Sequence, residues 1–170
     1  MRTRNQTTAK TRALVRGAII AAIYTALTLL FAPISYGEVQ IRIAESLTLL
    51  PILLPEAVPA LTIGCLLFNL SYAAALPLDA IVGTAASFLA TGAMWLTRKI
   101  TIKGYPLPGL LMPALFNALL VGWELSVYIG GGFGLNALYV AIGEAAVLLS
   151  LGAALYYAIR VRRLDKRLFG

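Results

Sequence analysis

The chain alternates between long apolar blocks and short polar segments. Five apolar runs approach or exceed the roughly 20 residues that a helix needs to cross a bilayer. They lie near residues 17–34, 47–71, 80–97, 107–129 and 135–159. The pattern predicts an all-α integral membrane protein.

Composition supports this prediction. Of the 170 residues, 60% are hydrophobic and 12% are charged, whereas a soluble domain carries about 25% charged residues. We expect residues 1–170 to form a single membrane domain, with basic tails near residues 1–11 and 161–170.

The segment over residues 35–45 has a different pattern, because apolar and polar side chains alternate along it. Its polar side chains include Glu38, Gln40 and Arg42, separated by apolar residues. A period of two is typical of an extended chain and places the three polar side chains on one face. The pattern predicts an extended loop on the outer side of the membrane, joining the first two helices.

The positions of the cations predict the topology. All but Arg42 fall into three clusters, which are Arg2 to Arg16, Arg98 to Lys103, and Arg160 to Arg167. Short loops rich in Lys and Arg stay in the cytoplasm, so an even number of spans should separate each pair of clusters. Four short spans fit residues 17–97 and two fit residues 104–159. We therefore expect a six-helix bundle in the cell membrane with both termini cytoplasmic.

Proline, glycine and the polar residues set the expected helix limits. The first helix is expected from Lys10 or Thr11 to Ala32, after a frayed polar tail. The others are expected over about residues 45–54, 58–70, 79–97, 109–128 and 136–160. We expect Tyr24 to pack within the first helix, Cys65 to be a small buried hydrophobe, and Glu56 to be a solvated or N-capping acid.

Several classes of site are excluded by composition. The chain has no histidine and a single cysteine, which removes the usual zinc sites, His-ligated haem, a Ser-His-Asp triad and an internal disulfide. It also lacks the glycine-rich phosphate loop of ATP-binding proteins. We expect no metal, no cofactor and no catalytic residues. The net charge of +7 lies in the tails and one loop, so we expect a lipid bilayer rather than nucleic acid as its partner.

The acids indicate a binding site in the outer half of the bundle. A charged side chain deep in lipid costs roughly 2.5–3.5 kcal/mol, so such residues face the interior of the bundle. On the predicted helices, Asn117 shares a face with Glu124, and Asn136 shares one with Glu144. The candidate substrate-binding residues are Glu38, Gln40, Arg42, Glu45, Asp79, Asn117, Trp123, Glu124, Asn136 and Glu144.

One cation cannot neutralise several acids in an apolar setting. Arg42 is the only basic residue near them in this topology, so we expect a ligand with hydrogen-bond donors, with or without a positive charge. Two alternatives stay open. Arg42 and hydroxyl groups can satisfy Glu124 and Glu144 as purely structural contacts, and Trp123 can belong to an interfacial aromatic belt instead of a stacking surface.

A stripe of small residues marks the first helix. Ala18, Ala22 and Ala26 are spaced four apart, which places them on one face where another helix can approach closely. This face can pack within the chain or serve as a docking surface for a different membrane subunit.

These features together resemble the QueT family of queuosine-precursor transporters, which are substrate-binding (S) components of energy-coupling factor (ECF) importers. The distinctive stretches are Gln40-x-Arg42-x-x-Glu45 and the segment from Asn117 to Glu124. Further matching stretches are residues 32–37, 55–57, 64–66, 116–118 and 143–144. The resemblance implies capture of a 7-deazaguanine such as 7-aminomethyl-7-deazaguanine, without enzymatic activity in this chain.

The resemblance also implies partners. A transmembrane coupling (T) protein would meet the face of Ala18, Ala22 and Ala26, and a pair of separate ATPase subunits would drive transport of this ABC-type importer. Three alternatives remain: an S component for another vitamin-like heterocycle, a structural or assembly subunit, and a membrane enzyme using Glu124 or Glu144 as acid or base.

Overall fold

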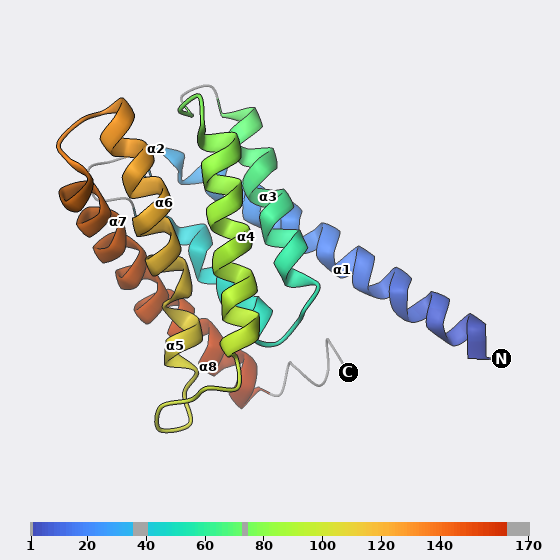
Figure 1. The fold of residues 1–170 in the computed structure, drawn as a ribbon. Helices are drawn as coiled ribbons and strands as arrows, with labels where there is room; N and C mark the ends of the chain where they lie inside the picture. Colours follow the sequence, from blue (N-terminus) through green and yellow to red (C-terminus); the bar gives the residue numbers. More distant parts are fainter. Residues whose placement is uncertain (1, 36–40, 73–74, 163–170) are drawn as a thin grey trace.

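The computed structural model describes residues 2–35, 41–72 and 75–162, and within these ranges it is helical without β-strands (Figure 1). The elements in chain order are α1 (Arg2–Leu30), α2 (Ala32–Ser35), the 3₁₀ helix η1 (Ile43–Ile52), α3 (Ala57–Ser71), α4 (Asp79–Thr97), α5 (Leu107–Leu110), α6 (Met112–Tyr128), α7 (Phe133–Val147), the π-helical turn η2 (Leu148–Gly152) and α8 (Ala153–Val161).

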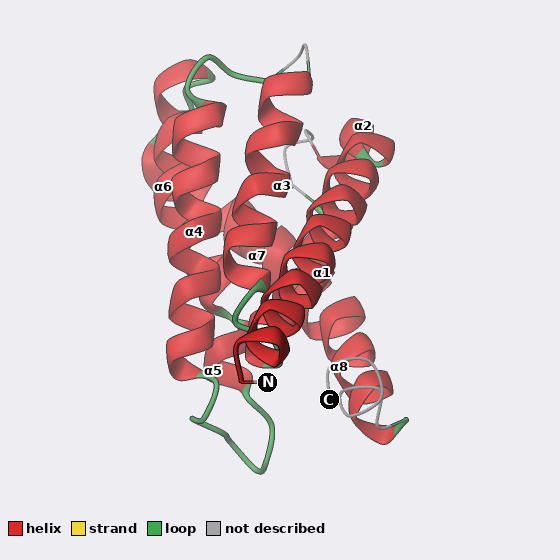
Figure 2. Ribbon diagram, turned by 90° about the vertical axis from the view of Figure 1, so that its right-hand side faces the viewer, coloured by secondary structure: helices red, strands yellow, loops and turns green. Residues whose placement is uncertain are grey.

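The long helices pack side by side in the order α1, α3, α4, α6 and α7 (Figures 1 and 2). Glycines allow two pairs of neighbouring helices to approach closely, namely α1 with α3 and α6 with α7. A Cβ on Gly64 of α3 would lie 3.0 Å from the backbone oxygen of Ala21 on α1, and one on Gly122 of α6 would lie 2.7 Å from the Cα of Ala137 on α7. Close backbone contact of this kind is typical of membrane helices, where small residues form the interfaces.

The 3₁₀ helix η1 fills the centre of the bundle. It packs against α1, α3, α4 and η2, and Leu49 and Leu50 belong to the main apolar core with Leu61, Leu110 and Leu148. Pro51 lies inside η1 and has no backbone N–H to donate. Because 3₁₀ runs of this length are uncommon, packing on all sides must stabilise the element.

Four helices are long and apolar enough to cross a membrane within the described part of the chain. They are Thr7–Leu30, Asp79–Thr97, Leu107–Tyr128 and Phe133–Val161, the last running through η2. Two shorter apolar helices, Ile43–Ile52 and Ala57–Ser71, occupy the positions predicted for the second and third spans. The all-helical membrane character is therefore confirmed, while the count of six crossings stays a prediction.

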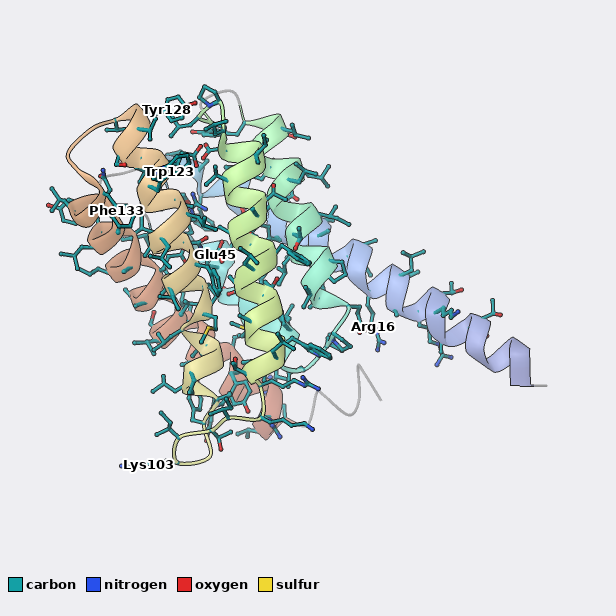
Figure 3. All side chains as sticks on the ribbon, in the orientation of Figure 1. Arg16, Glu45, Lys103, Trp123, Tyr128 and Phe133 are labelled. Carbon is teal, nitrogen blue, oxygen red and sulfur yellow. The ribbon has the colours of Figure 1, made fainter. Side chains whose placement is uncertain are left out.

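Two segments with basic residues lie at one end of the bundle. They are the loop after α4 and the end of α8 (Figures 1 and 2), and Lys103 marks the loop in Figure 3. The turn between α6 and α7, next to Tyr128, lies at the opposite end. The expected topology, in which the basic end faces the cytoplasm, stays a prediction.

Several predicted boundaries were wrong. The polar start of the chain is not a frayed tail, because α1 begins at Arg2 and projects beyond the bundle (Figure 1). Residues 2–11 contain no glycine or proline that would interrupt the helix. Residues 43–45 are not extended, because the 3₁₀ helix begins at Ile43, directly after an extended Arg42. Burial in the bundle favours the helix there, since it satisfies backbone groups internally. Residues 36–40 lie outside the described residues.

Candidate functional site

A buried hydrogen bond joins the first helix to the central 3₁₀ helix. The Tyr24 hydroxyl donates to Oε1 of Glu45 over 2.6 Å, and both side chains are 2% exposed. Tyr24 was expected only to pack, so its polar role was missed. The sequence did contain a signal for this role, because Tyr24 is the one tyrosine of α1 and its hydroxyl group needs a hydrogen-bond partner when buried.

A second buried pair links α6 to α7. The Asn117 side-chain amide donates to Oε1 of Glu144 over 2.9 Å. Oε2 of Glu144 has no hydrogen-bond partner among the described residues, although the side chain is 0% exposed. A buried acceptor without a donor costs about 1–3 kcal/mol, so this oxygen is suited to a donor from outside the chain.

Glu124 on α6 is the least satisfied acid. Its side chain is 0% exposed, and neither carboxyl oxygen accepts a hydrogen bond from a described N–H or O–H donor. Its neighbour is the carboxyl group of Asp79, the first residue of α4. Oδ2 of Asp79 accepts the backbone N–H of Leu76 over 2.6 Å, which fixes the Asp79 side chain beside Glu124.

Arg42 is the cation that these groups share. It is 8% exposed, and its charge acts on Glu45, Glu124 and Glu144. The described cluster thus combines the four acids Glu45, Asp79, Glu124 and Glu144 with this one cation. The acceptor oxygens of Glu124 and Glu144 that lack a described donor suit a ligand that brings N–H or O–H donors.

Separate elements bring the cluster together. Arg42 and Glu45 flank the start of η1, Asp79 begins α4, Asn117 and Glu124 lie on the buried face of α6, and Glu144 lies on that of α7. Figure 3 shows Glu45 in the middle of the bundle, behind α4 and α6. Because α7 begins at Phe133, Glu144 lies about three turns after the start of this helix, one turn deeper than the sequence predicted.

Some predicted site residues are not part of this cluster. Trp123 is 47% exposed on the surface of α6 (Figure 3). Neighbouring side chains of a helix point in different directions, so Trp123 faces outward when Glu124 faces inward. Asn136 donates its side-chain amide to the backbone oxygen of Gly130 over 2.7 Å and so holds the turn before α7. Glu38 and Gln40 lie outside the described residues, and their role stays a prediction.

The small-residue stripe lies on a free surface. Ala18, Ala22 and Ala26 are all exposed. Ala18 and Ala22 line a groove of about 600 Å³ between α1 and α3, whose α3 wall includes Ala60 and Ile63. The described chain leaves this face uncovered, so another membrane helix can reach it.

Glu56 has a different role from the one expected. It occupies the N-cap position of α3 but makes no capping hydrogen bond. Its Oε1 instead lies 2.8 Å from Nη2 of Arg16 on α1, so it is an ion-pair partner rather than a solvated acid. The pair joins α1 to α3 at the basic end of the groove. Cys65 is buried, as expected.

The described acids were compared with the grouping that a metal ion requires. No group of three or more Cys, Asp or Glu side chains within the described ranges is arranged to hold a metal ion.

Comparison with known proteins gives the family. Searches of curated proteins and of solved structures find no match. The family model described as QueT transporter matches residues 14–161, which is most of the chain. The resemblance read from the sequence is thus confirmed, and the chain belongs to the QueT transporter family.

Proposed function

We propose that this membrane protein captures a 7-deazaguanine precursor of queuosine and serves as the S component of an ECF-type importer. One observation carries the proposal: the buried carboxyl groups of Glu124 and Glu144 keep acceptor oxygens that no described donor satisfies. In an apolar bundle such acceptors usually mark a substrate pathway or site. Membership of a transporter family supports the same conclusion.

The chemistry of the cluster suits a guanine-type edge. That edge offers N–H donors at N1 and at the exocyclic N2, which a carboxylate accepts side by side, and an acceptor at O6. Glu144 supplies the carboxylate. Its neighbour Asn117 has a second amide N–H that can reach O6, and Arg42 offers further donors. Other polar heterocycles share parts of this hydrogen-bonding pattern. The choice of a deazaguanine among them therefore rests on the resemblance to the QueT family.

Ligand entry requires movement of the bundle. Glu124 and Glu144 have no exposed surface, so a ligand reaches them only if elements around them separate. A bound substrate would donate hydrogen bonds to the unsatisfied oxygens of Glu124 and Glu144 and so hold these elements together. We therefore expect binding to raise the melting temperature of the chain.

The proposed partners are a T protein and two ATPase subunits. The exposed stripe of Ala18, Ala22 and Ala26 and the adjoining groove present a close-packing surface that suits a helix of the T protein. The ATPases would act through that protein rather than on this chain directly.

Equilibrium binding tests the proposal. The full chain, purified in detergent and shown to be folded, is titrated with 7-aminomethyl-7-deazaguanine, 7-deazaguanine and a panel of vitamins. Saturable binding of the deazaguanines is the expected result. Tight binding of a vitamin instead would identify an S component for another heterocycle, and no binding by any compound would overturn the proposal.

A further inference from the structure

The two oxygens of the Glu144 carboxyl group differ in their hydrogen bonding. Oε1 accepts the side-chain amide of Asn117 over 2.9 Å, whereas Oε2 has no hydrogen-bond partner in the part of the chain that the structure describes. The Glu144 side chain has no exposed surface. It therefore presents one engaged and one open acceptor to the interior of the bundle.

Asn117 holds the Glu144 carboxyl group in one orientation. Only the nitrogen of the Asn117 amide can donate to a carboxylate, so the contact also fixes which way this amide points. Asn117 is itself 2% exposed and lies on α6, whose backbone closely approaches α7 where a Cβ on Gly122 would lie 2.7 Å from the Cα of Ala137. The packing of both helices thus leaves the carboxyl group little freedom to turn toward another donor.

Apolar side chains lie next to this pair, on the side of the turn between α6 and α7. Val121 lies one turn after Asn117 on α6, and Val140 lies one turn before Glu144 on α7. The two valines are 2% and 1% exposed and belong to the same buried apolar cluster. An unsatisfied acceptor is costly in apolar surroundings, so a donor that a ligand brings to Oε2 is strongly favoured there.

A planar ligand with two neighbouring N–H donors can satisfy both oxygens of Glu144 at once. Oε1 can accept a second hydrogen bond beside that of Asn117, and Oε2 can accept the other. A guanine-type edge has such donors at the ring nitrogen N1 and at the exocyclic amine N2. A ring without the amine has only one donor there and leaves one oxygen of the oriented carboxyl group without a ligand bond.

We propose that Glu144 selects heterocycles that carry an exocyclic amino group beside a ring N–H, and that Asn117 is its positioning residue. The inference rests on the proposed function and adds which group of the substrate the protein requires. A site that is built to bond an N–H group rejects the analogue that lacks it, because a buried polar group is then left unsatisfied. The selectivity acts on the 2-amino group and is independent of the substituent at position 7.

A matched ligand pair tests this selectivity. The full chain, purified in detergent, is titrated with 7-deazaguanine and with 7-deazahypoxanthine, which lacks only the exocyclic amino group. We expect the wild-type protein to bind 7-deazaguanine about 10- to 100-fold more tightly. Equal affinities would overturn the inference and leave the proposed function intact. Failure of every deazaguanine to bind would instead overturn the proposed function, and the inference with it.

Variants assign the selectivity to residues. Glu144→Gln replaces one oxygen by an N–H donor and is expected to bind both ligands weakly and with equal affinity. Asn117→Ala frees the carboxyl group to turn and is expected to reduce the preference for 7-deazaguanine severalfold. Asn136→Ala is the matched control and should keep the preference, because its amide bonds the backbone oxygen of Gly130 instead of a site residue.

The readout is a ratio of two affinities, which a general loss of stability leaves unchanged in a folded sample. A full preference for 7-deazaguanine in folded Glu144→Gln would overturn the role of Glu144. A full preference in folded Asn117→Ala would overturn that of Asn117. The ligand pair on the wild-type protein decides the inference even where a variant does not fold.

Discussion

The hydroxyl group of Tyr24 lies 2.6 Å from Oε1 of Glu45, so α1 and η1 are joined through a buried hydrogen bond across 21 positions of the sequence. Glu45 in turn shares Arg42 with Glu124 and Glu144. The helix that carries the exposed alanine stripe is thereby in direct contact with the polar cluster.

Tyr24→Phe is expected to destabilise the protein. The substitution removes the donor and leaves a buried carboxyl oxygen without it, which costs about 1–3 kcal/mol. The midpoint of unfolding can be followed with a thiol-reactive dye, because Cys65 is buried and the chain has only this one cysteine. Tyr157→Phe is the matched control, since Tyr157 is exposed; an equal shift in both variants would contradict a special role for Tyr24.

Glu144→Gln is expected to lose ligand binding without losing stability. The amide keeps an oxygen for the Asn117 donor, while a buried charge with few partners is removed, and burying a charge is costly. Thermal unfolding and ligand titration of the same sample separate the two effects. A lower melting temperature with unchanged ligand affinity would indicate a structural role for Glu144.

Gly122→Ala is expected to destabilise the contact between α6 and α7. The added Cβ would lie 2.7 Å from the Cα of Ala137, so the helices must move apart, at a cost of about 1–3 kcal/mol. Gly92→Ala on α4 is the control, because nothing lies within 4 Å of its added Cβ, and helix propensity favours alanine by about 1 kcal/mol. Opposite shifts in unfolding midpoint are expected, and a stable Gly122→Ala variant would contradict the tight contact.

Ala22→Trp is expected to abolish uptake while leaving ligand binding by the isolated chain unchanged. The large ring would fill the groove that Ala22 lines and keep a partner helix at a distance. Ala85→Trp, at an exposed position of α4, is the matched control and should transport normally. Transport assays in cells that contain the proposed ATPase and T subunits provide the measurement. Normal uptake by Ala22→Trp would contradict the proposed docking of a T protein in this groove.

Cysteine labelling in intact cells is expected to place the two ends of the bundle on opposite sides of the membrane. In a Cys65→Ala background, Ser71→Cys at the end of α3 should react with a membrane-impermeant maleimide. Lys103→Cys in the basic loop should react only after the cells are opened. The reverse pattern would direct the polar cluster toward the cytoplasm and contradict uptake from outside.

The sequence by itself determined the membrane character and most of the helices. Long apolar runs have few alternatives to helix in a bilayer, because every backbone polar group must be satisfied within the chain. The ends of α4, Asp79 and Thr97, could also be predicted, because Pro77 precedes the helix and the basic loop from Arg98 follows it. Buried acids are costly, so Glu45, Asp79, Glu124 and Glu144 could be expected to face inward from their type alone.

Only the tertiary structure decided which polar groups meet. Tyr24 and Glu45 are paired because η1 is folded into the centre of the bundle, and Glu56 pairs with Arg16 because α1 crosses the start of α3. Neither contact has a periodic signal, since each joins side chains far apart in the sequence. The tertiary structure also decided the direction of Trp123, which is adjacent to Glu124 in the chain but faces outward. Helical geometry turns neighbouring side chains in different directions, and the packing of α6 placed Glu124 in the interior.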